Sequence, residues 1–218
     1  MPYSISFFFL AELAGTIAFA CSGAMTAIEK KLDLLGVIVL GVTTAVGGGM
    51  IRDILLGELP PSLFLNPVYV LAAFLAVLVL FFLIRSRILA EKYLSAKAYE
   101  AILNLFDAIG LGIFTIVGID TGIAAGYGDN LFLIIFLGVI TGVGGGLLRD
   151  MMACQTPYIL KKHVYACASL AGAFCYVGLL KLLPREAALS ASALLVVAIR
   201  LLARHYKWNL PVAGCSKA

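Results

Sequence analysis

Apolar residues run along this chain in long stretches that short polar segments separate. A helix that crosses ~30 Å of hydrocarbon needs roughly 17 to 25 mostly apolar residues, and the stretches have this length. They are apolar throughout, whereas the strands of a membrane barrel alternate between polar and apolar positions. The pattern therefore predicts an all-α integral membrane fold of seven helices: Ile5–Ile28, Leu34–Gly57, Pro67–Ile84, Ala101–Ile119, Leu131–Met151, Val164–Leu183 and Ala187–Leu202.

The composition supports a membrane as the solvent. Hydrophobic residues make up 62% of the chain and charged residues 13%, and the mean hydropathy is +1.06. Water cannot be the medium that most of such a surface faces. The first apolar stretch is not preceded by a basic segment and is too long for a secretion signal, so we expect a retained helix and no soluble domain.

A short motif occurs twice. Gly41–Asp53 and Gly138–Asp150 are identical at nine of thirteen positions, and each contains GGG followed by an arginine and an aspartate. The motifs fall in the second and fifth predicted helices, so each repeat contributes three helices and the two copies cross the membrane in opposite senses. We expect an inverted repeat with boundaries at 1–97 for the first copy, 98–184 for the second, and 185–218 for the seventh helix and a tail.

The glycine triplets are costly in a helix, at roughly 1 kcal/mol per glycine relative to alanine. We therefore expect a kink or unwound turn in the second and in the fifth helix that lines a polar path, and nearby threonine hydroxyls are candidates to line it as well. The alternatives are close helix packing for the glycines and bonding to their own helix for the threonines. On the first interpretation alanine at the middle glycine stabilises the protein but impairs the path. The residues concerned are Thr44, Gly47, Gly48, Gly49, Thr141, Gly144, Gly145 and Gly146.

Charges within the predicted spans need partners or water, because burying them in a bilayer is expensive. They are Glu12, Arg52, Asp53, Asp107, Arg149 and Asp150. Adjacent residues project about 100° apart on a helix, which argues against pairing within each Arg-Asp dipeptide. We predict one ion pair in each half, Glu12 with Arg52 and Asp107 with Arg149, with a role either in pinning the helices or in permeation.

Positively charged residues predict the orientation, since cytoplasmic loops retain Lys and Arg. With the N-terminus outside and the C-terminus in the cytoplasm, thirteen of the sixteen lie at the inner side, and Arg52, Lys181 and Arg185 remain outside. The location expected is the plasma (inner) membrane, and the basic inner rim would attract anionic lipid headgroups. The net charge of +4 reflects this topology and not a nucleic-acid surface.

The sequence contains no motif that indicates a catalytic site. The five cysteines have no CxxC spacing, and neither a nucleophile with its base, nor zinc-ligand spacing, nor a nucleotide fingerprint is present. We expect no enzyme, no cofactor and no metal site.

The doubled GGGxxRD, the Ser-Gly at Ser22 and Gly23, and the pattern of three plus three plus one helices resemble the prokaryotic trimeric intracellular cation (TRIC) channels. The same family is known as a glycine transporter domain in two tandem copies. The resemblance implies a homotrimer with one pore per protomer between the second and fifth helices, conducting monovalent cations such as K+ and Na+. It implies that the two triplets are the kink glycines. The basic residue and phosphoinositide site of animal members have no match here. A small-solute, glycine-like transporter is the alternative function.

Overall fold

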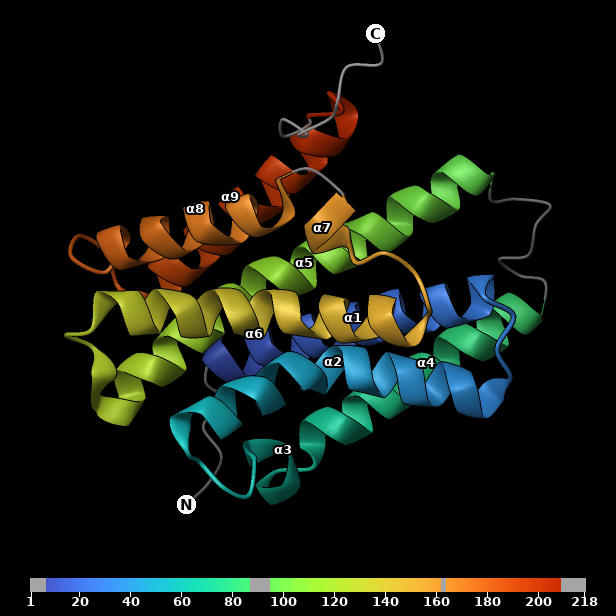
Figure 1. The fold of residues 1–218 in the computed structure, drawn as a ribbon, viewed down its shortest axis with the longest axis horizontal. Coiled ribbons are helices and arrows are strands. Elements are labelled where there is room, and N and C mark those ends of the chain that lie inside the picture. The colour runs from blue at the N-terminus through green and yellow to red at the C-terminus, as the bar shows by residue number, and fades with distance from the viewer. Residues whose placement is uncertain (1–6, 87–94, 162–163, 209–218) are drawn as a thin grey trace, which may run out of the picture.

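The computed structural model describes residues 7–86, 95–161 and 164–208, and these segments contain helices and turns but no strand. Figure 1 shows the long helices packed side by side, with α4, α5 and α9 inclined to α2 and α6. In chain order the elements are α1 (Phe7–Glu29), α2 (Leu34–Leu56), α3 (Ser62–Leu65), α4 (Val68–Arg85), α5 (Ala96–Gly122), the π-helical turn η1 (Ile123–Tyr127), α6 (Leu131–Met152), α7 (Tyr158–Lys161), α8 (Tyr165–Leu179) and α9 (Arg185–His205).

Polar residues between the apolar stretches begin several of these helices. The side chain of Asp33 accepts a hydrogen bond from the backbone N–H of Gly36 at 2.7 Å, and Asn130 caps α6 in the same way through Leu133. Ser95 caps α5 through Ala98. Such caps satisfy backbone donors that the first turn leaves free, so the loop sequences fix where the spans start.

Six helices are long and apolar enough to cross a membrane, and α8 is a shorter apolar helix of 15 residues. At 1.5 Å per residue α8 is roughly 22 Å long, less than the hydrocarbon thickness. We expected a longer helix over Val164–Leu183, but Val164 lies outside it with a left-handed backbone, at φ 66°. In contrast, α5 begins at Ala96, before the expected Ala101.

The helices form two groups of three, with α9 beside the second. The contacting triples are α1, α2 and α4, and α5, α6 and α8, while α9 packs on α5 and α8. In Figure 1, α2 and α6 lie together in the middle of the bundle. Their contact is antiparallel, because Gly48 faces Thr141 while Thr44 faces Gly145.

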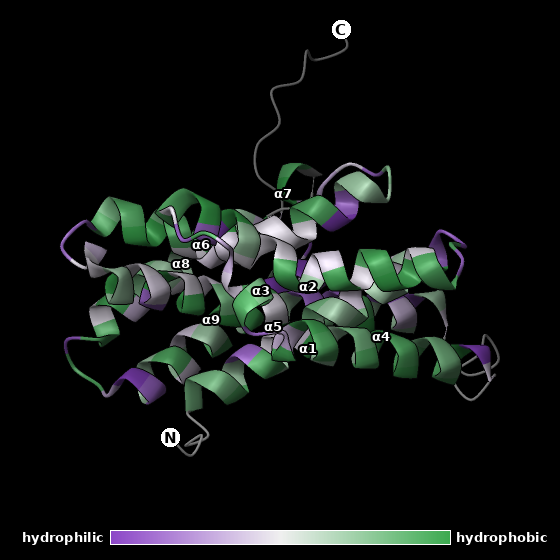
Figure 2. Cartoon of the chain, turned by 90° about the horizontal axis from the view of Figure 1, so that it is seen from below, coloured by the Kyte–Doolittle hydropathy of each residue, from purple (hydrophilic) through white to green (hydrophobic). Residues whose placement is uncertain are grey.

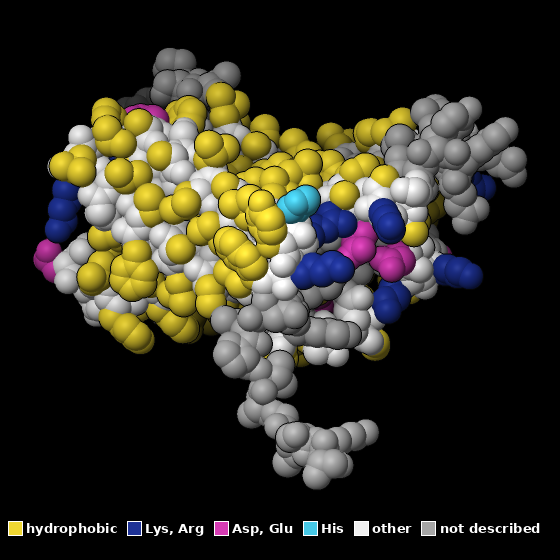
Figure 3. All heavy atoms as spheres, turned by 90° about the horizontal axis from the view of Figure 1, so that it is seen from above, with side chains coloured by type: hydrophobic (Ala, Val, Ile, Leu, Met, Phe, Trp, Pro, Cys, Tyr) yellow, Lys and Arg dark blue, Asp and Glu magenta, His cyan; other side chains and the backbone are white. Residues whose placement is uncertain are grey.

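Figure 2 shows that hydrophobic residues make up most of the long helices, and Figure 3 shows hydrophobic side chains over much of the face that it presents. Lys and Arg gather, with some Asp and Glu, toward one part of the face seen in Figure 3. Large apolar residues such as Phe132, Leu65 and Leu75 are exposed, as is expected of surfaces that contact lipid or another subunit. Of the basic residues used for the orientation, Arg87, Lys92, Lys162 and Lys217 lie outside the described residues.

The glycine triplets lie in continuous α-helix, so the unwound turn expected from the sequence is not present. A Cβ built on Gly48 would lie 2.0 Å from the carbonyl oxygen of Thr141, and one on Gly145 would lie 2.2 Å from that of Thr44. No side chain fits at these two positions. The middle glycine of each triplet therefore lets the backbones of α2 and α6 touch, as the packing alternative predicted.

Candidate functional site

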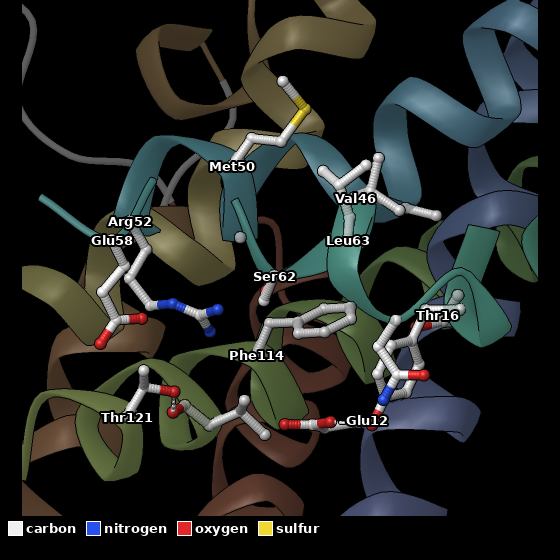
Figure 4. Close-up of a pocket in the computed structure, with 15 residues that line it drawn as sticks. Glu12, Thr16, Val46, Met50, Arg52, Glu58, Ser62, Leu63, Phe114 and Thr121 are labelled. Carbon is white, nitrogen blue, oxygen red and sulfur yellow. Dashed lines mark hydrogen bonds between the residues drawn. The ribbon is translucent and has the colours of Figure 1, made fainter. Parts of the chain in front are cut away.

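A cavity of about 320 Å³ lies between α1, α2, α4, α5 and the segment around α3, at the end of α2 that carries the first Arg-Asp dipeptide. Figure 4 shows the Arg52 guanidinium and the Glu12 carboxylate both facing this space, from α2 and α1 respectively. Glu58 lines its rim. The remaining lining residues are Thr16, Ala45, Val46, Gly49, Met50, Ser62, Leu63, Asn66, Tyr69, Phe114, Val117 and Thr121.

Arg52 pairs with its neighbour Asp53. Nε and one terminal nitrogen of Arg52 donate to the same carboxylate oxygen of Asp53, at 2.9 and 2.7 Å. The second Asp53 oxygen accepts from the backbone N–H and the hydroxyl of Ser62, at 2.8 and 2.7 Å, and so caps α3. Our expectation that adjacent residues would not neutralise each other was wrong, because the arginine side chain is long enough to fold back onto the carboxylate.

Glu12 does not form the predicted ion pair with Arg52. Its carboxylate accepts a hydrogen bond from the Tyr69 hydroxyl, and no cation of the described segments forms an ion pair with it. Arg52 is held by Asp53 instead. The cavity separates the two residues that the sequence suggested as partners, although it brings both to one site (Figure 4).

The predicted pair of the second half is confirmed. Arg149 lies 2.6 Å from Asp107 and 2.8 Å from Asp150, and it donates to the hydroxyl of Ser22 at 2.5 Å. Arg200 of α9 approaches the other oxygen of Asp107, at 3.5 Å. Arg149 and Asp107 are fully buried in this cluster.

The two Arg-Asp dipeptides thus make the same kind of contacts but differ in solvent exposure. Asp150 accepts from the backbone N–H of Tyr158 at 2.7 Å, as Asp53 does from Ser62, so each aspartate holds the short helix that follows. Arg52 retains 8% exposure beside an open cavity, whereas Arg149 has 0%. The first dipeptide therefore borders a cavity, whereas the arginine of the second is fully buried.

The two threonines do not offer free hydroxyls. Thr44 donates to the carbonyl of Leu40 at 2.6 Å and Thr141 to that of Leu137 at 2.5 Å, so both bond to their own helices. Neither lines the cavity. The alternative of self-bonding is the one that the structure bears out.

Sequence reasoning missed two tyrosines and one arginine of these clusters. Tyr69 donates to Glu12, Tyr165 lies 3.4 Å from Asp107, and Arg200 joins the second cluster. Tyr69 and Tyr165 lie 96 positions apart in the sequence, close to the spacing that relates Glu12 to Asp107. The repeat alignment contained this signal, whereas Arg200 belongs to a helix outside both repeats.

Comparison with known proteins places the chain in a family. A family model described as Glycine transporter matches twice, at residues 9–85 and 104–181. A UPF0126 membrane protein of Deinococcus radiodurans is 37% identical over 203 residues, which is 92% of this chain and 89% of the relative.

Solved structures give the same result. One, described as the structural basis for conductance through TRIC cation channels, is 38% identical with a TM-score of 0.81, and the match covers 97% of this chain and 99% of that one. A TRIC trimeric intracellular cation channel orthologue from Rhodobacter sphaeroides is 32% identical with a TM-score of 0.81, covering 92% and 98%. The proteins that this chain is similar to are therefore membrane proteins and channels and not enzymes. The chain is a multi-pass integral membrane protein that belongs to the Glycine transporter family, carries its domain twice, and has the fold of the prokaryotic TRIC cation channels.

Proposed function

We propose that the protein is a channel for monovalent cations, with potassium as the principal ion. The observation that carries the proposal is the charge of the cavity. Glu12 and Glu58 both line it, while Arg52, the one cation among its described lining residues, is already paired with Asp53. The excess of carboxylates favours cations at the entrance of a path through the protein.

The proposed path runs from this cavity along the α2–α6 contact to the Arg149 cluster. In the described conformation the path is closed there, because Arg149 fills the space between Asp107, Asp150 and Ser22. Opening requires the guanidinium to leave and the two helices to separate. A bend of α2 at Gly47–Gly49 and of α6 at Gly144–Gly146 would provide that movement, since a helix bends most easily at glycines, which have no side chain.

The assembly follows from the same proposal. Three copies would associate, each with its own pore, and the exposed apolar faces would meet lipid or a neighbouring subunit. The repeats 1–97 and 98–184 would be inverted, with the cavity on the outer side and the N-terminus outside. Anionic lipids of the inner membrane would then contact the basic cytoplasmic rim.

Recordings from purified protein in planar bilayers test the proposal directly. Under a potassium chloride gradient, the reversal potential should lie near the equilibrium potential for potassium, and replacing potassium by sodium should leave a cation current. A reversal potential near that of chloride, or no current from well-folded trimers, would refute the channel.

The transport of a small solute such as glycine is the second candidate. The description of the family and the presence of both charge signs in the cavity favour it. Labelled glycine uptake into proteoliposomes separates the two functions, because a carrier would saturate and exchange substrate without conducting potassium alone.

A further inference from the structure

In the second half of the protein, an aspartate and a tyrosine together contact the guanidinium groups of two arginines. Asp107 and Tyr165 lie 3.4 Å apart, and two guanidinium groups surround them. Arg149 donates to one oxygen of Asp107 at 2.6 Å. Arg200 lies 3.5 Å from the other oxygen, and its central carbon lies 4.6 Å from the centre of the Tyr165 ring. The pair therefore binds guanidinium both through its carboxylate and through its aromatic face.

The first half contains the same pair without those guanidinium groups. Glu12 occupies the place of Asp107 and Tyr69 that of Tyr165, and the tyrosine hydroxyl again donates to the acid. Arg52 is the counterpart of Arg149. Two of its guanidinium nitrogens donate hydrogen bonds to Asp53 instead. Arg200 has no counterpart, because it comes from α9, which packs on α5 and α8. The carboxylate of Glu12 faces the cavity without an ion-pair partner in the described part of the chain.

The cavity fits a small planar cation. Its volume of about 320 Å³ is ample for a guanidinium group with a short substituent. Tyr69 and Phe114 give it aromatic lining, and Glu58 adds a second carboxylate at the rim. Figure 4 shows Phe114 between the acid and Arg52. A flat, weakly hydrated guanidinium can stack on these rings, which a spherical alkali cation cannot do.

We propose that the outer cavity is a binding site for a small guanidinium-class organic cation, with Glu12 as its carboxylate ligand and Tyr69 and Phe114 as its aromatic contacts. The occupant reproduces in the first half what Arg149 and Arg200 supply in the second. A zwitterionic amino acid fits less well, because its carboxylate would enter a space that already has two acids and whose arginine is neutralised. The inference goes beyond the proposed channel, since binding requires no conduction. If both hold, the bound cation blocks current from the outer side.

Titration calorimetry on purified protein in detergent tests the site, with methylguanidinium as ligand and methylammonium, potassium and glycine as comparisons. Methylguanidinium should bind more tightly than the other three. Glu12→Gln, which keeps the shape of the side chain, should weaken its binding by about tenfold or more, as expected for the loss of a charged hydrogen-bonded partner. Glu186→Gln is the control for net charge, because Glu186 lies in the first turn of α9 and does not line the cavity, and it should change binding far less.

A second variant guards against misfolding. Tyr69→Phe keeps the ring but removes the hydroxyl that donates a hydrogen bond to Glu12. This variant should retain measurable methylguanidinium binding, and it can be measured even if Glu12→Gln does not fold. Equal binding by wild type and a folded Glu12→Gln protein would overturn the proposal, as would tighter binding of glycine or of methylammonium. No binding of methylguanidinium to wild type would do the same.

The two proposals fail separately. Calorimetry that detects a Glu12-dependent site in protein without current refutes the channel and keeps the site. A potassium current that methylguanidinium does not inhibit from either side, from protein that does not bind it, refutes the site and keeps the channel.

Discussion

Gly48 of α2 touches the backbone of Thr141 on α6, where a Cβ would lie 2.0 Å from the carbonyl oxygen. The contact is between two main chains, so a rotamer change cannot relieve a clash there. Its counterpart pairs Gly145 with Thr44 at 2.2 Å. Together these contacts fix the distance between the two central helices.

Alanine at Gly48 should therefore destabilise the protein, although it favours helix formation. The added methyl group must push α6 away, and overpacking of this kind typically costs about 1–3 kcal/mol or more. Gly49→Ala is the matched control, because the nearest atom that its Cβ would meet is a guanidinium nitrogen of Arg52, at 3.8 Å. This variant should gain up to about 1 kcal/mol of helix propensity. Thermal unfolding of the two variants in detergent gives the comparison. A melting temperature for Gly48→Ala at or above that of Gly49→Ala would contradict the close contact.

A pair of double-mutant cycles should distinguish the two halves. Arg149→Gln leaves the buried Asp107 and Asp150 without their shared cation, whereas Asp107→Asn leaves Arg149 with Asp150 alone. Each should cost up to about 3–5 kcal/mol, and their effects should be non-additive by about 0.5–3 kcal/mol. The cycle of Glu12→Gln with Arg52→Gln should be additive to within about 0.5 kcal/mol, since Arg52 is bonded to Asp53. The measurement is the free energy of unfolding of all variants. Strong coupling in the second cycle would mean that Glu12 and Arg52 do meet.

The sequence alone was sufficient for the helical fold and for part of the site. The long apolar stretches identified the spans because the bilayer imposes their length. Asp107 and Arg149 were paired correctly because both are buried charges at one depth. The reasoning failed for Arg52, whose pairing depends on which way a long side chain folds, and for Gly48, where composition permits either a kink or a close contact. Whether a glycine forms a kink or a close contact depends on which helix packs against it, and the sequence alone does not show which helix that is.

The carboxylates of the cavity should control ion selectivity if the channel proposal holds. Glu12→Gln and Glu58→Gln each remove one negative charge from the entrance, so the preference for potassium over chloride should fall in both and further in the double variant. Glu186→Gln is a control for net charge, because Glu186 lies in the first turn of α9 and does not line the cavity. Reversal potentials under a potassium chloride gradient report the preference. Unchanged reversal potentials in the double variant would exclude the cavity from the path.

The orientation can be tested at the two short helices that the aspartates hold. Leu59, before α3, is 70% exposed and Leu160, within α7, is 76% exposed, so a cysteine at either place is accessible without disturbing the core. In a cysteine-free background, an impermeant thiol reagent added to intact cells should label Leu59→Cys, and it should label Leu160→Cys only after the membrane is opened. The reason is that α3 follows α2 and α7 follows α6, and inverted repeats place the ends of these two helices on opposite sides of the membrane. A cysteine at Leu32, which is 41% exposed between α1 and α2, adds an independent inner position and should behave like Leu160→Cys. Labelling of Leu59→Cys and Leu160→Cys from the same side would exclude inverted repeats, and reversed labelling of all three would place the cavity in the cytoplasm.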